Sequence, residues 1–330
     1  MIDRTLLAKV KDCVVRGHKF VLTTHVNPDG DGLGCEAALA AWLLDLGKDV
    51  FIFNHSPVPA NYKFLDPDKM MKVYNRDQHR EILLSVDHVI ILDISDWNRL
   101  RELGVDIREA PVAKICIDHH PPQDKFVDLK VVDTNSCATG EIIYDLLKFA
   151  GAKISRRIAE ALYTSIITDT GSFRFSNTNP RAFRICGELV ETGISPQRIY
   201  QNIYEHQPIS KIRLFAHALN HLKMEERGRV VWFEIAKEVL AEKGANTYDT
   251  EGFADYPRVI NGVEVSIMFI EMDDAKFKVS LRSRGNHVIN GIAQKFGGGG
   301  HPYAAGIMIE GSMKEYIPRI LEEVSYLFKN

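Results

Sequence analysis

Side chains that can hold a metal ion gather in four segments of the chain. The first segment carries one imidazole and two carboxylates around a proline and a glycine: His25, Asp29 and Asp31. In the second segment an apolar run ends at Asp93, and in the third a carboxylate precedes two imidazoles: Asp118, His119 and His120. The fourth segment, 168–173, contributes Asp169.

Carboxylates packed together would repel one another and raise each other's pKa unless cations neutralised them. Asp oxygens and His nitrogens without thiolate suit hard divalent ions such as Mn²⁺ or Mg²⁺, with Co²⁺ or Zn²⁺ as substitutes. The four segments together hold enough candidate ligands for two ions. Two neighbouring ions can share a bridging water, lower its pKa and stabilise both oxygens of a phosphoryl displacement. The sequence therefore predicts metal-dependent hydrolysis of a phosphate ester.

Each residue taken alone has a simpler explanation. An Asp in a Pro-Gly turn is ordinary turn chemistry, Asp93 can cap a helix, and a single His is more often structural than a ligand. The triplet 118–120 is harder to explain, because two neighbouring imidazoles at a strand end gain little from burial. The combination favours a metal site.

Apolar runs typical of buried parallel strands precede the candidate ligands. These runs cover 19–24, 49–53, 88–92 and 113–117, and a helical pattern covers 33–46. Open parallel sheets bind ligands at the carboxyl ends of their strands, where three of the segments lie. Further helices are predicted over 139–149, 155–168, 180–192 and 196–204, which places Asp169 at a helix end.

The pattern then changes to a polar helical segment, 207–226, followed by strands over 229–235, 263–271 and 276–284. We expect an α/β protein with a mostly parallel N-terminal sheet flanked by helices and a second, smaller α/β domain. The boundaries are a catalytic domain over 1–195, a helical linker over 196–218 and a substrate-binding domain over 219–330, with the active site in the cleft between the domains.

The C-terminal part carries groups that can bind a phosphate. The strand period of two places Arg282 and Arg284 on one face, where guanidinium groups can bind phosphate, although exposed arginines are often only solvated. Four consecutive glycines, 297–300, then precede His301 and Pro302. Such a loop can offer N–H groups to an anion, and Pro302 suits the first turn of a following helix. A plain flexible turn is the alternative.

Composition narrows the class of protein. The formal charge of −3 argues against a broad basic surface for long duplex nucleic acid, so short substrates are favoured. The five cysteines are scattered without a Cys-x-x-Cys pair, which indicates a reducing compartment. The first residues do not look like a signal peptide, and charges interrupt every stretch before it reaches the roughly 20 apolar residues of a membrane-spanning helix. We expect a cytoplasmic location and no membrane contact.

The four metal segments resemble the motifs of the DHH phosphoesterase superfamily, named for its Asp-His-His triplet, and the glycine-histidine segment is similar to its associated C-terminal domain. The resemblance spans nearly the whole chain. It implies one metal held by His25, Asp29 and Asp93. It implies a second held by Asp31, Asp93, His119 and Asp169, with Asp31 and Asp93 nearest the bridging nucleophile.

The resemblance also implies roles for the remaining site residues. Asp118 would support the metal-binding imidazole, and His120 would face the substrate phosphate or leaving group. The nucleotide would contact Arg282, Gly298, Gly299, Gly300 and His301, and Arg174 is a weaker candidate for a phosphate contact. Arg284 is a further candidate because the strand period places it on the face of Arg282.

Within the superfamily, the chain is similar in order and length to the nanoRNase type. This implies hydrolysis of dinucleotides and short RNA to mononucleotides and of 3′-phosphoadenosine 5′-phosphate to AMP, in some relatives also of linear or cyclic di-AMP, and a homodimer. One alternative is a manganese inorganic pyrophosphatase, against which the glycine-histidine loop argues. Another is a non-catalytic nucleotide-binding regulator, which usually lacks a metal ligand, whereas every ligand position here is filled.

Overall fold

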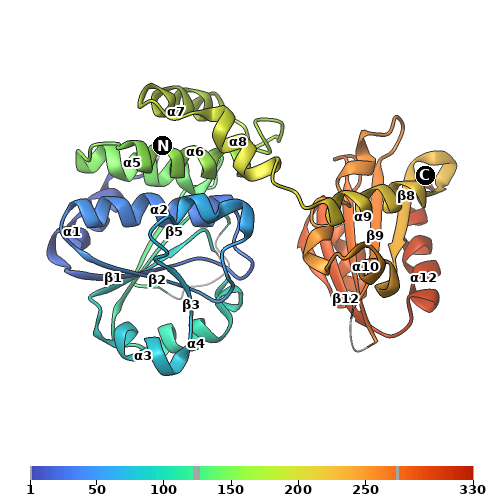
Figure 1. The fold of residues 1–330 in the computed structure, drawn as a ribbon, viewed down its shortest axis with the longest axis horizontal. Helices are drawn as coiled ribbons and strands as arrows, with labels where there is room; N and C mark the ends of the chain where they lie inside the picture. Colours follow the sequence, from blue (N-terminus) through green and yellow to red (C-terminus); the bar gives the residue numbers. More distant parts are fainter. Residues whose placement is uncertain (1, 95, 122–126, 273–274, 330) are drawn as a thin grey trace. The chain divides into compact units, whose positions relative to one another are not determined.

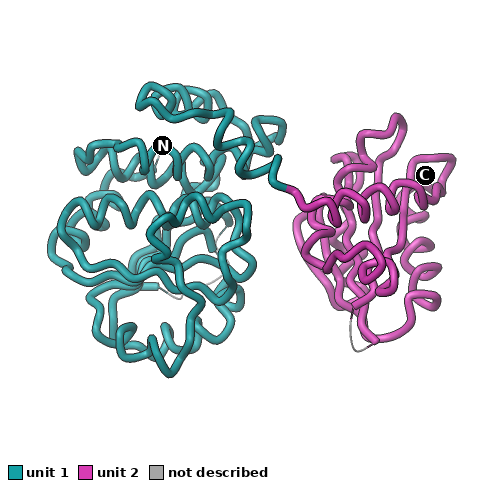
Figure 2. Tube along the Cα trace, in the orientation of Figure 1, with its two compact units in different colours: residues 1–206 teal, residues 207–330 magenta. Residues whose placement is uncertain are grey.

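The computed structural model describes residues 2–94, 96–121, 127–272 and 275–329. The chain divides into two compact units, residues 1–206 and 207–330 (Figure 2). This boundary falls within the segment predicted as a helical linker, 196–218. Helix α8 (Pro196–Tyr204) lies in the first unit and helix α9 (Ile209–Asn220) in the second.

The first unit is built on a six-stranded parallel sheet with the order β3-β2-β1-β4-β5-β6. Its strands are β1 (Lys19–Thr23), β2 (Asp49–Asn54), β3 (Met71–Val73), β4 (His88–Leu92), β5 (Ala113–Asp118) and β6 (Leu129–Val132). The apolar runs predicted the four longer strands. The short edge strands β3 and β6 were not predicted, because neither carries a run of that kind.

Helices cover both faces of this sheet (Figure 1). They are α1 (Arg4–Arg16), α2 (Gly30–Asp45), α3 (Arg76–Ser85), α4 (Arg101–Glu109), α5 (Thr139–Ala150) and α6 (Arg156–Asp169), and α7 (Pro180–Glu191) packs on α6. Helices α1, α2, α5 and α6 lie on one side, and α3 and α4 lie on the other. Each side buries its own apolar cluster. The predicted helix-flanked parallel sheet is confirmed.

Helix α2 lies between the sheet and helices α5 and α6. Nearly all of its residues are buried, which suits a helix that is apolar on every side. Its contact with α6 is close at Gly34, where an added Cβ would lie 2.5 Å from the carbonyl oxygen of Ala161. Glycine at this position lets the backbones of the two helices approach.

Gly34→Ala is therefore expected to destabilise the protein by about 1–3 kcal/mol, because the methyl group would force α2 and α6 apart. Gly187→Ala, in the middle of α7, is the matched control, since an added Cβ there meets no atom within 4 Å. The control should be neutral or stabilising by roughly 0.5–1 kcal/mol. Urea unfolding of both variants measures the difference, and equal midpoints would contradict the close helix contact.

The second unit contains a mixed six-stranded sheet with the order β11-β12-β10-β9-β8-β7. Its strands are β7 (Lys223–Glu225), β8 (Val230–Ile235), β9 (Val265–Glu271), β10 (Lys276–Ser283), β11 (Gly299–His301) and β12 (Ala304–Glu310). Apolar side chains of α9 and α10 (Lys237–Lys243) join one core, and those of α11 (Asn290–Lys295) and α12 (Met313–Ser325) join another. The predicted second α/β domain is confirmed.

Two local predictions for this unit were wrong. The segment 207–226 was expected to be helical throughout, but residues 223–225 form edge strand β7, which pairs with β8. Pro302 does not begin a helix, because it lies in the turn between β11 and β12. Residues 304–310 alternate between less and more buried positions, which is the period of a strand. Among the described residues, no helix is long and apolar enough to cross a lipid bilayer.

Candidate metal centre

The candidate ligands come from separate segments that meet at one edge of the first sheet. His25 follows β1, Asp93 follows β4 and His119 follows β5, so all three lie at the carboxyl ends of strands. Asp31 lies in the first turn of α2, and Asp169 is the last residue of α6. The connections reverse direction between the neighbouring strands β1 and β4, and such switch points are where open parallel sheets bind ligands.

The first ligand group consists of His25, Asp29 and Asp93, whose ligand atoms lie within 4.8 Å of one another. The His25 ring is buried, and its Nδ1–H donates to the carbonyl oxygen of Val26 at 2.9 Å. Its Nε2 therefore faces the carboxylates, 3.6 Å from Oδ2 of Asp29 and 3.5 Å from Oδ2 of Asp93. The backbone carbonyl fixes the ring in the orientation that a metal ligand needs.

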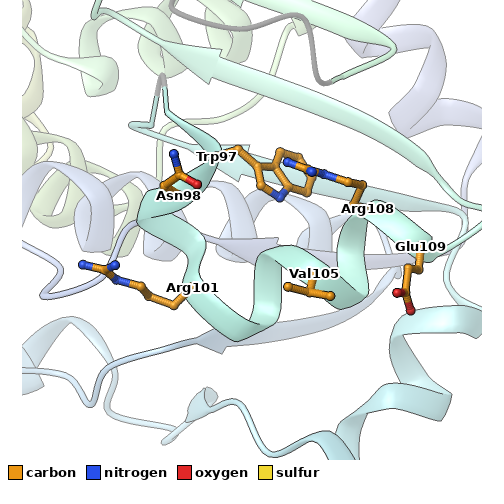
Figure 3. A pocket seen from close by; sticks show the side chains of 6 residues that line it. All are labelled: Trp97, Asn98, Arg101, Val105, Arg108 and Glu109. Atoms are coloured by element: carbon orange, nitrogen blue, oxygen red, sulfur yellow. The ribbon is translucent and has the colours of Figure 1, made fainter.

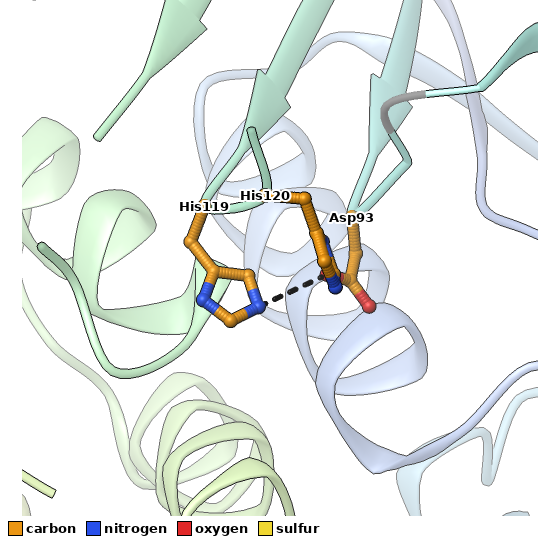
Figure 4. A group of neighbouring side chains, drawn as sticks. All are labelled: Asp93, His119 and His120. Atoms are coloured by element: carbon orange, nitrogen blue, oxygen red, sulfur yellow. Dashed lines mark ion pairs between the residues drawn. The ribbon is translucent and has the colours of Figure 1, made fainter. Parts of the chain in front are cut away.

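The second group consists of Asp31, His119 and Asp169. Nδ1–H of His119 donates to the carbonyl oxygen of Ser136 at 3.2 Å. Its Nε2 lies 3.8 Å from Oδ2 of Asp31 and 3.5 Å from Oδ2 of Asp169. This nitrogen is buried and has no hydrogen-bond partner among the described residues. Figure 4 shows the ring directed toward Asp93, whose Oδ1 lies 3.8 Å away.

These distances fit a metal ion better than direct hydrogen bonds. Separations of 3.5–3.8 Å between the imidazole nitrogens and the carboxylate oxygens are too long for good hydrogen bonds. Two ligands of one ion, each about 2.0–2.2 Å from it, lie roughly this far apart. The orphaned Nε2 of His119 and the oxygen-rich donor set therefore suit a hard divalent ion.

Asp29 combines turn chemistry with a position at the site. It is the N-cap of α2, and its Oδ1 accepts from the amides of Asp31 at 3.0 Å and Gly32 at 3.2 Å. Its Oδ2 is the atom that faces His25. The two interpretations that the sequence offered for Asp29 therefore use different oxygens of the same side chain.

The backbone of Asp93 adopts the left-handed conformation, which residues other than glycine, asparagine and aspartate rarely use. Its φ is 58°, and its N–H donates to the carbonyl oxygen of Ile117 on the neighbouring strand at 3.0 Å. Strained backbone of this kind concentrates at functional sites, where the surrounding structure holds it in place.

Several residues that the sequence did not single out hold the ligands in place. Asp31 accepts hydrogen bonds from the amides of Thr139 and Gly140 and from the hydroxyl of Ser165. Nδ2 of Asn177 donates to Oδ2 of Asp169 at 3.2 Å. Thr139 and Gly140 begin the predicted helix 139–149, but the sequence could not show which carboxylate lies at that helix end.

The structure corrects one inferred contact. Asp118 was expected to support the metal-binding imidazole, His119, but that ring is held by Ser136. Instead, Oδ1 of the buried Asp118 accepts from the amide of His120 at 3.1 Å and from its Nδ1–H at 2.8 Å. The reason is local geometry, because a carboxylate readily accepts from the backbone and side chain two residues further on.

Burial and mutual repulsion perturb the carboxylates of the cluster. Burial raises the pKa of Asp31 well above its usual range, and the charges of Asp93 and Asp169 raise it further. Burial and the charge of Asp93 likewise raise the pKa of Asp169 to about 8. Burial also acts to raise the pKa of Asp93, but contact with His25 holds it below its usual range. A cluster perturbed in this way is typical of a site that binds cations.

Metal binding is expected to release protons. Burial lowers the pKa of His25, but Asp29 and Asp93 raise it to about 10, and the pKa of Asp169 is about 8. Both groups therefore carry protons near pH 7 in the metal-free protein and must lose them to bind an ion. Calorimetric Mn²⁺ titrations in buffers of different ionisation enthalpy should show proton release and an affinity that rises with pH. A buffer-independent heat would contradict these pKa shifts.

The predicted substrate-binding residues of the second unit also come together. In the sheet register, Ala304 of β12 pairs with Arg282 of β10 on one side and with His301 of β11 on the other. Residues paired in this way point to the same face, so Arg282 and His301 lie on either side of a small alanine. Nε of Arg282 donates to Oδ2 of Asp255 at 3.2 Å. Arg284 lies beyond the end of β10 and is exposed.

The glycines before His301 have a structural reason to be there. An added Cβ at Gly298 would lie 2.2 Å from the carbonyl oxygen of Gly306, and Gly300 has a φ of 138°. The hairpin of β11 and β12 therefore requires glycine at both positions.

Arg174 lies in the first unit, exposed on the loop after α6, with its Nε donating to the carbonyl oxygen of Gly171 at 2.7 Å.

A surface pocket of about 590 Å³ lies elsewhere on the first unit, beside α4 and the short helix η2 (Trp97–Leu100). Figure 3 shows its lining, which includes Arg101, Val105 and Arg108. The guanidinium of Arg108 lies 5.0 Å from the centre of the Trp97 ring, a cation–π contact that closes one wall. None of the predicted site residues lines this pocket.

Comparison with known proteins agrees with the fold. Residues 19–166 match the model of the DHH family, N-terminal domain, and residues 230–330 match the DHHA1 domain. The chain is 32% identical over 308 residues to the bifunctional oligoribonuclease and PAP phosphatase NrnA of Thermus thermophilus, covering 92% of this chain and 88% of that protein. It is 31% identical over 294 residues to the protein of the same name from Bacillus subtilis, covering 88% of this chain and 89% of that one.

A solved structure is also similar along its whole length. The crystal structure of an exopolyphosphatase-related protein from Bacteroides fragilis has a TM-score of 0.95 and 28% sequence identity, covering 100% of this chain and 99% of that one. The Asp-His-His triplet lies at the carboxyl end of a strand of the parallel sheet, and both family models match in the expected order. The chain therefore belongs to the DHH family, and its second unit carries a DHHA1 domain.

Proposed function

We propose that this protein is a two-metal phosphoesterase that hydrolyses short nucleotide substrates. The observation that carries the proposal is the pair of ligand groups that meet at Asp93. Oδ2 of Asp93 faces His25 in the first group, and its Oδ1 faces His119, the imidazole of the second. One carboxylate therefore faces both groups, so Asp93 would help to hold both ions.

Bound divalent ions, in this proposal Mn²⁺ with Mg²⁺ or Co²⁺ as substitutes, would neutralise the carboxylates, activate water and stabilise charge on a phosphoryl group. The protein's own residues prepare the site for them. His25 and His119 present Nε2 because backbone carbonyls hold their Nδ1–H groups. His120 is held by Asp118, and its pKa of about 9 keeps a proton that can be given to a leaving oxygen or to a phosphate.

The substrate class rests on the second unit and on the relatives. Arg282 and His301, which lie on either side of Ala304, offer a guanidinium and an imidazole to the phosphates of a nucleotide. Relatives named oligoribonuclease and PAP phosphatase are similar over most of the chain. We therefore favour dinucleotides, short RNA and 3′-phosphoadenosine 5′-phosphate as substrates, with linear or cyclic di-AMP as further candidates.

The proposal is tested by incubating the full chain with Mn²⁺ and a substrate panel. The panel contains 3′-phosphoadenosine 5′-phosphate, linear and cyclic di-AMP, 5′-phosphorylated RNA of graded length, and pyrophosphate. Release of mononucleotides or AMP, abolished by a chelator, is the expected result. Hydrolysis of pyrophosphate alone would instead identify a pyrophosphatase, and binding without any turnover would identify a regulator.

Replacing Arg282 is expected to weaken substrate binding more than turnover. A charged hydrogen bond contributes about 1.5–3 kcal/mol, so Arg282→Gln should raise KM roughly 10- to 100-fold with a smaller change in kcat. Lys278→Gln is the matched control, because Lys278 is exposed on the same strand four residues earlier. Steady-state kinetics on 3′-phosphoadenosine 5′-phosphate measure both constants. An unchanged KM in Arg282→Gln would remove this arginine from the binding surface.

We also propose a cytoplasmic location. All five cysteines are free thiols, which is typical of proteins that work in a reducing compartment.

The homodimer implied by the family resemblance stays a prediction, and light scattering of the purified chain would test it.

A further inference from the structure

Thr139 contacts two of the proposed metal ligands at once. Its backbone N–H donates to Oδ2 of Asp31 at 2.8 Å, and its hydroxyl donates to Oδ1 of Asp93 at 3.0 Å. The residue is fully buried at the start of α5. No other residue described in the structure donates hydrogen bonds to both of these carboxylates.

The start of α5 explains why Asp31 is held there. The N-cap residue is Ala138, which has no side chain that can accept a hydrogen bond from the first amides of the helix. The carboxylate of Asp31, from α2, takes the amides of Thr139 and Gly140 instead. A negative group at this position is also favoured by the helix dipole. A candidate metal ligand thus caps a helix other than its own.

The remaining contacts leave Asp31 one oxygen for a metal. Its Oδ1 accepts from the amide of Gly140, the hydroxyl of Ser165 and the thiol of Cys35. Its Oδ2 accepts only the amide of Thr139 among the described residues and faces His119. Residue 140 must be glycine, because an added Cβ there would lie 2.0 Å from Oγ of Ser165.

Asp93, unlike Asp31, directs both of its carboxylate oxygens toward candidate metal ligands. Its two oxygens face different ligand groups, so rotation of the carboxylate would change its distance to both His25 and His119. The hydrogen bond from the Thr139 hydroxyl to Oδ1 of Asp93, at 3.0 Å, fixes this rotation. Because the same residue holds Asp31 through its amide, it also fixes the spacing between the two carboxylates.

We propose that Thr139 is a positioning residue of the metal centre, which sets the relative orientation of Asp31 and Asp93 through its amide and its hydroxyl. The proposal rests on the proposed function in taking these two carboxylates as metal ligands. Outer contacts of this kind typically change metal affinity 10- to 100-fold when they are removed.

The test is a calorimetric titration of the full-length protein with Mn²⁺ alone. Thr139→Val keeps the volume and the amide but removes the hydroxyl, and it should weaken Mn²⁺ binding about 10- to 100-fold. Thr139→Ser should restore the affinity of the unaltered protein. Thr164→Val is the matched control, because the Thr164 hydroxyl is equally buried but donates to the carbonyl oxygen of Glu160 in α6.

Circular dichroism checks that each variant is folded, and Thr139→Ala provides a second variant that adds no bulk. Unaltered Mn²⁺ affinity in a folded Thr139→Val or Thr139→Ala variant would overturn the proposal. Equal weakening in Thr164→Val would also overturn it, since it would show a general effect of losing a buried hydroxyl. The titration uses no substrate, so failure of the proposed hydrolysis is a separate result from failure of this one.

Discussion

Asp93→Asn is expected to abolish metal-dependent hydrolysis while leaving the fold intact. The loss should exceed the roughly 10- to 100-fold that outer contacts of a metal centre typically cost. Asparagine has the same shape, but one oxygen becomes an NH₂ group that cannot bind a metal. Since the two oxygens of Asp93 face His25 and His119 separately, the substitution removes at least one of the two contacts.

The backbone makes asparagine the least disruptive replacement at this position. Asp93 has a φ of 58°, and asparagine tolerates this left-handed conformation better than most residues. Asp96→Asn is the control, because Asp96 caps η2 through the amide of Asn98 and asparagine caps helices equally well. Mn²⁺-dependent turnover, metal stoichiometry and circular dichroism should be measured together. Unchanged turnover in Asp93→Asn would remove Asp93 from the bridging position.

The parts of the site that depend on local sequence could be predicted. The apolar runs 88–92 and 113–117 match β4 and β5 closely, since buried parallel strands need continuous apolar residues. A ligand after such a run must lie at the edge of the sheet where other strands also end. The sequence therefore located His25, Asp93 and His119 without any knowledge of the strand order.

Contacts between distant segments could not be predicted in the same way. Thr139 and Asp31 are 108 positions apart, and Ser165 and Asp31 are 134 apart. Neither residue has a type or a spacing that marks it as a partner of a carboxylate. These contacts depend on how α2, α5 and α6 pack, which follows from close approaches such as that of Gly34 to Ala161.

The wrong predictions have similar causes. Edge strand β7 consists of three exposed residues, 223–225, and its pairing with β8 outweighs any local helical preference. Pro302 would suit the first turn of a helix, but burial alternates along residues 304–310 with the period of a strand, so the proline lies in a turn before β12. Support of His119 by the Ser136 carbonyl left no sequence signal, because every residue has a backbone carbonyl.

Asp118→Asn is expected to reduce turnover about 10- to 100-fold and to shift its pH dependence. Burial lowers the pKa of His120, but the hydrogen bond to Asp118 and the charge of Asp93 raise it to about 9. An acid must carry its proton to act, so activity is lost as the pH rises through the pKa that His120 has in the metal-bound enzyme, which the Asp118 hydrogen bond raises. The neutral amide cannot stabilise the imidazolium to the same extent. The alkaline limb of the kcat profile should therefore move to lower pH in the variant.

A double-mutant cycle separates this role from a general loss of stability. If Asp118 acts through His120, then His120→Ala and the double variant should have nearly the same kcat, because the carboxylate has no imidazole left to support. Additive losses, or an alkaline limb that stays in place in Asp118→Asn, would show that Asp118 acts elsewhere. Its Oδ2 is buried without a hydrogen-bond partner among the described residues, so it is the atom through which such a second role would be exerted.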